Sequence, residues 1–268
     1  MSLKYHILGM NHYGLNSYKL LKNKNYTTTI SDIKKKSNII KNIKIKNLIS
    51  ENFYFSGHPK HLIDKSKKII YSPGIIKTSL QYKSYFKNKK NLSEFDLFYS
   101  LNKWKKSNIL IITGSKGKTT LCKKIITELS KKSTFSKIYY MDRKKYTFSN
   151  LPKFKKDFFL VAEVDYQMLL LNKKMFAKYR IITSIDYKEN KALKSNKLYL
   201  HAKSKILKGL KSSDYLISDN LTFKKIKKNN TKVGKNIIIM KNSRSISKKN
   251  KYFLETFLSL INNENKKN

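Results

Sequence analysis

The sequence has little of what marks secreted or membrane proteins. Its 268 residues include one cysteine, Cys122, which excludes an internal disulfide and indicates a reducing compartment. No apolar run approaches the roughly 20 residues that a membrane-spanning helix needs. Residues 1–10 lack the apolar segment of a signal peptide. We therefore expect a cytoplasmic monomer without a membrane partner.

Arginine and acidic residues are also scarce. Three of the 60 basic residues are arginine, against 16 acidic residues, and the formal net charge is +44. So large a positive charge would ordinarily indicate a polyanionic partner. Surfaces that grip phosphates or base edges usually depend on the bidentate fork of arginine, however. We interpret the lysine excess as a solvated surface shaped by biased codon composition, and we expect no specific nucleic-acid partner.

Short apolar runs alternate with lysine-rich amphipathic stretches along the chain. Strands are expected at residues 5–8, 27–30, 68–71, 108–112, 158–162, 180–184, 215–218 and 236–240, and helices at 14–21, 118–129, 199–210 and 252–261. This alternation predicts an α/β fold with parallel sheets and crossover helices. The polar stretch 88–93 resembles a linker, so we predict one domain over residues 1–90 and a second over residues 91–268.

Glycine is rare, and its placement is informative. Five of the eight glycines lie at three strand-to-loop junctions: Gly9, Gly14, Gly74, Gly114 and Gly117. Glycine is needed where the backbone turns tightly or approaches a phosphate without a Cβ in the way. The clustering therefore indicates anion-binding loops.

The clearest motif is a phosphate loop between a predicted buried strand and a predicted helix. It reads Gly114-Ser115-Lys116-Gly117-Lys118-Thr119-Thr120. Main-chain amides and the helix N-terminus can cradle a triphosphate there. Lys118 would reach the β and γ phosphates, and the Thr119 hydroxyl would ligate Mg²⁺. Two residues separate the glycines here, whereas four separate them in the common form of this loop.

That shortened loop resembles the ATP site of the Mur ligase family, whose members add amino acids to the peptidoglycan precursor. Further stretches resemble the family's segments in the family's order: residues 7–15, Gly57-His58, residues 69–75, residues 93–98, residues 162–167, residues 199–203 and Asn250. Within the family, the resemblance is greatest to the member that adds D-glutamate. It implies a Rossmann-like UDP-binding domain, then a P-loop-type central ATPase domain with a mostly parallel sheet.

The resemblance also assigns roles to individual residues. It implies ATP and Mg²⁺ as cofactors, with nucleotide contacts from Gly114, Ser115, Lys116, Gly117, Lys118, Thr119, Thr120 and Asn250. It implies catalytic roles for Lys118, Glu163 and Lys203, and metal ligation by Thr119, Glu163 and a carbamylated Lys203. It places the UDP precursor at Gly9, Asn11, Gly14, Asp32, Ser72, Pro73 and Gly74.

The implied reaction joins D-glutamate to UDP-N-acetylmuramoyl-L-alanine through an acyl phosphate. The sequence departs from the family at Lys116, where the family has Asn, and at residues 183–189, where its metal-assisting His is missing. The family's Asn-Ile-Gly segment has no clear counterpart within residues 139–152. The family's third domain is expected to be absent, so we expect ATP binding but little ligation unless a separate chain supplies that domain.

Two alternatives stay open. The chain could be a Mur-family member for a different amino acid or precursor. It could instead be a basic P-loop protein that acts on nucleic acid and uses ATP as a switch. That second alternative predicts clustered arginines and stacking aromatics on one face, whereas the aromatics here lie mostly inside apolar runs.

Overall fold

The structure, a computed structural model, divides into two compact units. It describes residues 4–42, 50–102, 108–132, 135–142, 147–151, 158–173, 175–190, 193–227, 236–240 and 245–265. The first unit comprises residues 1–103 with two later segments, 147–152 and 171–173. The second comprises residues 104–146, 153–170 and 174–268. Each unit is built on its own parallel sheet.

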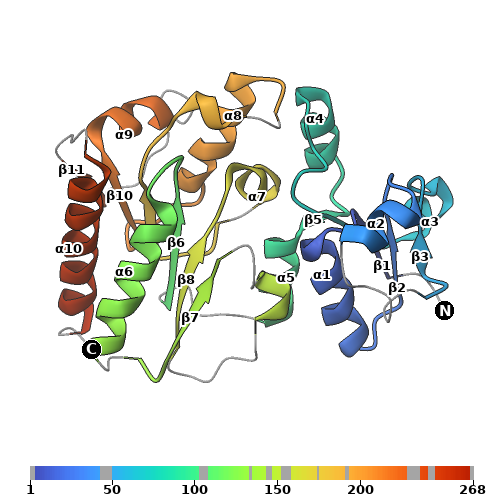
Figure 1. Cartoon of the computed structure of the whole chain (residues 1–268), viewed down its shortest axis with the longest axis horizontal. Helices are drawn as coiled ribbons and strands as arrows, with labels where there is room; N and C mark the ends of the chain where they lie inside the picture. Colours follow the sequence, from blue (N-terminus) through green and yellow to red (C-terminus); the bar gives the residue numbers. More distant parts are fainter. Residues whose placement is uncertain are drawn as a thin grey trace. The chain divides into compact units, whose positions relative to one another are not determined.

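The described residues of the first unit form a Rossmann-like sheet of five parallel strands in the order β3-β2-β1-β4-β5. The strands are β1 (Tyr5–Leu8), β2 (Thr28–Ser31), β3 (Phe53–Tyr54), β4 (Lys68–Tyr71) and β5 (Asn91–Ser93). One helix follows each strand (Figure 1): α1 (His12–Asn23), α2 (Lys36–Asn42), α3 (Lys60–Lys65), α4 (Ser79–Lys87) and α5 (Glu94–Asn102). Ligand crevices of such sheets lie where the strand order reverses, which here is between β1 and β4.

Strand β5 occupies the stretch in which we expected a linker. Asn91 is buried and donates from its side chain to the carbonyl of Tyr85 at 3.0 Å. The Ser93 hydroxyl accepts from the Asp96 amide at 3.0 Å and donates to the Asp96 carboxylate at 2.8 Å, where α5 begins. The polarity of this stretch therefore serves buried hydrogen bonds and a helix cap, and the first unit continues past residue 90 to Lys103.

In the part of the second unit that the structure describes, six parallel strands form a sheet in the order β11-β10-β9-β6-β8-β7. The strands are β6 (Ile109–Thr113), β7 (Lys137–Met141), β8 (Phe158–Glu163), β9 (Tyr179–Ile182), β10 (Tyr215–Asp219) and β11 (Ile237–Met240). The longer helices are α6 (Lys118–Lys131), α7 (Tyr166–Leu171), α8 (Asn196–Ser204), α9 (Asn220–Lys227) and α10 (Ile246–Asn265). The predicted α/β class with parallel sheets is confirmed.

One predicted helix, residues 199–210, has the wrong bounds. Helix α8 begins earlier, because the Ser195 side chain caps it by accepting from the Leu198 amide. It ends at Ser204 and gives way to a short 3₁₀ turn, η5 (Lys205–Leu207). Gly209 then takes a φ of 66°, a left-handed conformation that ends the helical path.

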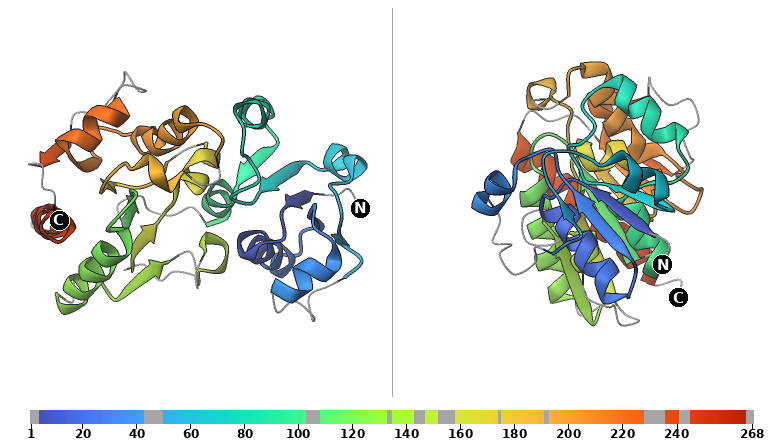
Figure 2. Two further views of the ribbon diagram at one scale, coloured as in Figure 1. Left: turned by 45° about the horizontal axis from the view of Figure 1, so that its top comes forward. Right: turned by 90° about the vertical axis from the view of Figure 1, so that its right-hand side faces the viewer.

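The core of the second unit lies between the sheet and helices α6 and α10, which run side by side in Figure 1 and are neighbours in the left view of Figure 2. Fully buried members include Leu110, Ile112, Leu121, Cys122, Ile125, Val161, Phe253 and Phe257. Burying each such apolar side chain contributes about 1.5–3 kcal/mol. This packing fixes α6 against β6 and so fixes the loop between them.

Within the described residues, no helix is both long enough and apolar enough to cross a membrane.

Candidate functional site

The phosphate loop connects β6 to α6 and depends on two glycines with positive φ. Gly114 has a φ of 140°, and Gly117, which caps α6, has a φ of 84°. A Cβ on Gly114 would overlap the Thr183 hydroxyl, and one on Gly117 would lie 3.0 Å from the Asn250 side-chain oxygen. Both conformation and space therefore require glycine at these positions.

The loop is fastened to the carboxyl end of β9. Ser115 donates its amide to the Ser184 carbonyl at 3.0 Å, and Lys116 donates its amide to the Ser184 hydroxyl at 3.0 Å. The Thr183 hydroxyl donates to the Lys116 carbonyl at 2.7 Å. Thr183 and Ser184 were not predicted as site residues, although they are the last two residues of the strand predicted at 180–184 and directly follow β9. Because these bonds engage the first loop amides, an anion would bind at the first turn of α6.

Two lysine side chains meet at one loop carbonyl. Lys118 Nζ donates to the Gly114 carbonyl at 2.6 Å and to the Ser115 carbonyl at 3.2 Å. Lys203 Nζ, from α8, donates to the same Gly114 carbonyl at 3.0 Å and to the Thr113 hydroxyl at 3.2 Å. The structure thus brings two of the predicted catalytic residues together at the mouth of the loop.

Lys203 lies in an aromatic setting that differs from that of a surface lysine. It is 1% exposed, and its amine lies 5.6 Å from the ring centroid of Tyr199 and 6.0 Å from that of Tyr166. Its contacts are those of an ammonium donor, whereas a metal ligand must offer an oxygen. The carbamylated form of Lys203 therefore stays a prediction from the family resemblance.

Thr119 and Glu163 form the oxygen pair that a hard cation would need. The Thr119 hydroxyl donates to Glu163 Oε2 at 2.7 Å, and Glu163 is 2% exposed at the end of β8. The described part of the chain contains no group of three His, Cys, Asp or Glu side chains suited to a metal. One carboxylate and one hydroxyl nevertheless fit Mg²⁺, which takes most of its ligands from phosphate and water.

Tyr140, on β7, adds a second donor to this carboxylate. Its hydroxyl donates to Glu163 Oε2 at 3.2 Å. Burial, followed by the influence of Cys122 and Glu163, raises the pKa of Tyr140 well above its usual range. The phenol therefore stays protonated. No sequence motif marked this residue.

The remaining predicted nucleotide residues lie around the same loop. Asn250, buried on α10, donates to the Gly117 carbonyl at 3.2 Å. The Ser115 hydroxyl lies 2.8 Å from the Tyr199 hydroxyl. The Lys116 ammonium lies 3.4 Å from the Asp186 carboxylate and is exposed. Thr120 is exposed on the first turn of α6.

The predicted UDP-precursor residues gather in the first unit, at the carboxyl end of its sheet. Gly9 has a φ of 94°, and a Cβ on Gly14 would overlap the Gly9 carbonyl, so the start of α1 approaches the loop closely. Asn11 caps α1 by accepting from the amides of Tyr13 and Gly14. The Asp32 carboxylate accepts from the amide of Met10 at 2.7 Å.

The Ser72-Pro73-Gly74 turn meets that loop directly. The Ser72 hydroxyl donates to the Gly9 carbonyl at 2.9 Å, and the Asn11 side chain donates to the Pro73 carbonyl at 3.1 Å. Gly74 has a φ of 93°. The structure thus collects all seven predicted residues at the carboxyl ends of β1, β2 and β4. Their role in ligand binding stays a prediction.

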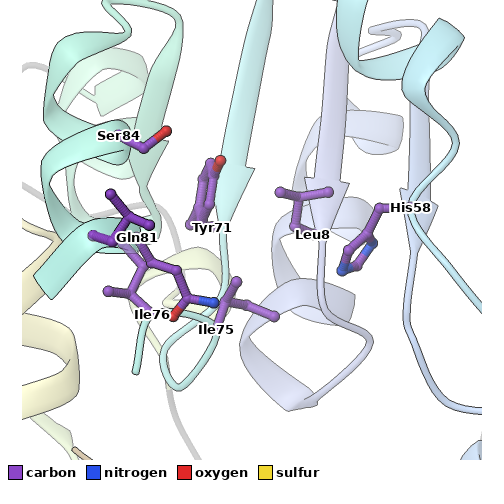
Figure 3. Close-up of a pocket in the computed structure, with 8 residues that line it drawn as sticks. Leu8, His58, Tyr71, Ile75, Ile76, Gln81 and Ser84 are labelled. Atoms are coloured by element: carbon purple, nitrogen blue, oxygen red, sulfur yellow. The ribbon is translucent and has the colours of Figure 1, made fainter. Parts of the chain in front are cut away.

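A pocket of about 400 Å³ opens beside this cluster (Figure 3). Its walls are mostly apolar and are formed by Leu8, His58, Tyr71, Ile75, Ile76, Leu80, Gln81 and Ser84. Leu8 and Tyr71 end β1 and β4, the pair at which the strand order reverses. An apolar pocket with a few polar groups in this position is typical of a ligand site.

A chain of hydrogen-bonded side chains leads to His58 in the pocket wall. Its Nδ1 lies 2.7 Å from the Ser31 hydroxyl, which lies 2.9 Å from His6 Nε2, and His6 Nδ1 lies 2.7 Å from the Thr29 hydroxyl. Burial, with neighbouring histidines, lowers the pKa of His6 to about 4, so this ring is neutral at pH 7. Burial also lowers the pKa of His58. This hydrogen-bonded chain fixes the His58 ring in the pocket wall.

The segment 147–151 also contributes to the first unit, a placement that the sequence did not indicate. Ser149 donates its amide to Glu94 at 2.8 Å, and its hydroxyl lies 3.0 Å from that of Ser17 on α1. The Phe148 ring packs edge-on against Phe95 of α5, with ring centroids 4.6 Å apart. This segment thus packs on both α1 and α5.

Comparison with known proteins bears on the fold. No protein-family model matches the chain, and no curated protein matches it. The solved UDP-N-acetylmuramate:L-alanyl-gamma-D-glutamyl-meso-diaminopimelate ligase from Neisseria meningitides is similar, with a TM-score of 0.52 and 11% identity. That alignment covers 89% of this chain and 78% of the other.

Two further solved structures are similar at lower scores. The UDP-N-acetylmuramate-alanine ligase MurC from Thermotoga maritima is 17% identical, with a TM-score of 0.42, over 89% of this chain and 53% of the other. The MurF ligase from the same organism, in complex with ADP, is 15% identical, with a TM-score of 0.41. That alignment covers 67% of this chain and 43% of the other. With its two parallel sheets and the Neisseria likeness, the chain has the α/β domain fold of the Mur ligases.

Proposed function

We propose that the chain is an ATP-dependent ligase of the Mur type, which adds D-glutamate to UDP-N-acetylmuramoyl-L-alanine. The observation that supports this best is the convergence of Lys118, Thr119 and Glu163 on a glycine loop at the carboxyl end of β6. An ammonium, a hydroxyl and a carboxylate are the groups that a magnesium-bound triphosphate needs.

The proposed chemistry has two steps. The γ-phosphoryl group moves from ATP to the alanyl carboxylate, which gives an acyl phosphate and ADP. The D-glutamate amine then attacks the acyl carbon, the amide bond forms, and phosphate leaves as the amine loses a proton. Mg²⁺, held by Thr119 and Glu163, would offset the phosphate charge, and Lys118 would neutralise the transferring oxygens. Such a site acts mainly by positioning and electrostatics.

The precursor would bind to the first unit. Its glycine loop at Gly9, with the start of α1, suits a diphosphate. The adjacent apolar pocket, with His58 in its wall, suits a flat ring such as uracil. The preference for D-glutamate rests on the resemblance of residues 72–75 and on the shortness of the N-terminal domain, so other amino acids are the competing outcomes.

The first test is nucleotide affinity. Lys118→Ala should weaken ATP binding roughly 10- to 100-fold, because a charge-assisted contact to phosphate contributes about 1.5–3 kcal/mol. Lys123→Ala, an exposed lysine on the same helix, should leave the affinity unchanged. Isothermal titration with Mg²⁺-ATP measures the affinity of both variants and of the unaltered chain. Equal ATP affinities for Lys118→Ala and the unaltered chain would defeat the phosphate-loop assignment.

The second test is turnover. Phosphate release is measured with UDP-N-acetylmuramoyl-L-alanine and, in separate reactions, D-glutamate, L-alanine or meso-diaminopimelate. Release that needs both the precursor and D-glutamate supports the proposal. Release with another amino acid would indicate a different Mur-type activity, and release stimulated only by a polynucleotide would indicate the nucleic-acid alternative.

A further inference from the structure

The Glu163 carboxylate receives donors from two different elements. Thr119, on α6, and Tyr140, on β7, both donate to its Oε2, at 2.7 and 3.2 Å. Glu163 itself ends β8, the strand that pairs with both β6 and β7. The carboxylate therefore sits where three elements meet, and its orientation depends on more than its own rotamer.

The two donors would contribute differently to cation binding. Thr119 belongs to the phosphate loop motif and would itself touch the cation. Tyr140 lies one strand away, opposite Val161 in the β7–β8 register. Its ring packs beside the core of the second unit, while its hydroxyl reaches the carboxylate. Groups that hydrogen-bond to a metal ligand commonly fix its orientation and tune its affinity for the metal.

We infer that Tyr140 is a positioning residue, which orients the Glu163 carboxylate toward the divalent cation that accompanies ATP. The inference rests on the proposed function, because it presupposes that nucleotide and cation bind at this loop. With the Tyr140 hydroxyl in place, Oε2 is held between two donors, and the carboxylate plane is fixed beside Thr119. Without that hydroxyl, the carboxylate keeps its charge but loses one of the donors that constrain its orientation.

The test separates cation binding from nucleotide binding. Tyr140→Phe removes only the hydroxyl and keeps the packed ring. The Mg²⁺ concentration that half-saturates ATP binding should rise about 10-fold, the lower range for loss of a group that orients a metal ligand. ATP affinity in EDTA should stay unchanged, which also reports that the variant is folded.

Two controls make the test specific. Tyr139→Phe, on the opposite face of the same strand, should leave the Mg²⁺ requirement unchanged. In a Glu163→Gln background, Tyr140→Phe should have no further effect, because it would act only through that carboxylate. A structural role for the hydroxyl would instead lower ATP affinity with and without Mg²⁺.

The outcomes distinguish the inference from the proposed function. If the unaltered chain binds ATP with Mg²⁺, and Tyr140→Phe shows the same Mg²⁺ requirement, the inference is overturned and the proposed function stands. If the unaltered chain shows no Mg²⁺-dependent ATP binding, the proposed function fails first, and the role of Tyr140 fails with it.

Discussion

Single residues in the phosphate loop are constrained by both conformation and space. Gly114 combines a φ of 140° with a position at which a Cβ would overlap the Thr183 hydroxyl. That hydroxyl is engaged with the Lys116 carbonyl, so it cannot move aside without releasing the loop. No residue with a Cβ can replace the glycines at this turn without strain.

We expect Gly114→Ala to abolish measurable ATP binding and to lower the free energy of unfolding by about 1–3 kcal/mol, because it adds backbone strain to a steric clash. Gly209→Ala is a matched control, since Gly209 also has a positive φ but meets nothing within 4 Å. The control should cost stability but leave ATP affinity unchanged. Isothermal titration and thermal melting check both variants, and intact ATP binding by Gly114→Ala would contradict this account.

At the scale of elements, one buried side chain ties β9 to the turn after α8. The Arg180 guanidinium, 0% exposed, donates to the carbonyls of Ile206 at 2.7 Å and Lys208 at 2.9 Å. It also pairs with the buried Asp214 carboxylate at 3.5 Å. Burial lowers the pKa of Arg180 to about 10, with Asp214 opposing the shift, so the group stays charged at pH 7. A lysine could not make this set of contacts, because it lacks the planar fork.

Arg180→Met should lower the free energy of unfolding by about 3–5 kcal/mol, because it leaves the Asp214 carboxylate buried without its cation. Adding Asp214→Asn should recover part of this loss, since the buried negative charge is then removed. Urea unfolding followed by circular dichroism measures both. A double variant no more stable than Arg180→Met would show that the charge is not the cause.

At the scale of the whole molecule, segments distant in sequence meet in the first unit around Glu94. This side chain is 3% exposed and accepts from the Ser149 amide at 2.8 Å, while its Oε2 has no hydrogen-bond partner. Burial raises the pKa of Glu94 to about 7, and hydrogen bonds from Thr147 and Ser149 oppose the shift. The folded chain therefore holds this proton more tightly than the unfolded chain does.

Stability should consequently fall as pH rises from about 4.5 to about 7, by at most about 3 kcal/mol from this group. The contribution is fully present below the unfolded pKa and is lost as pH passes the folded one. Glu94→Gln should remove this slope and raise stability at pH 8. Glu128→Gln, at a partly exposed position on α6, serves as the control. Urea unfolding at pH 5 and pH 8 provides the comparison, and an unchanged slope in Glu94→Gln would refute the assignment.

The sequence by itself determined the strand–loop–helix at residues 108–129, because apolar runs and glycine turns are local signals. It also determined the α/β class, because alternating strands and helices form parallel sheets with few alternatives. Only the tertiary structure revealed Tyr140 on Glu163, the two lysines at the Gly114 carbonyl and the packing of residues 147–151 on α1 and α5. Those contacts join residues far apart in the chain. Lys118 and Lys203 were predicted as site residues, but no local pattern shows which distant group a tyrosine, lysine or serine side chain reaches.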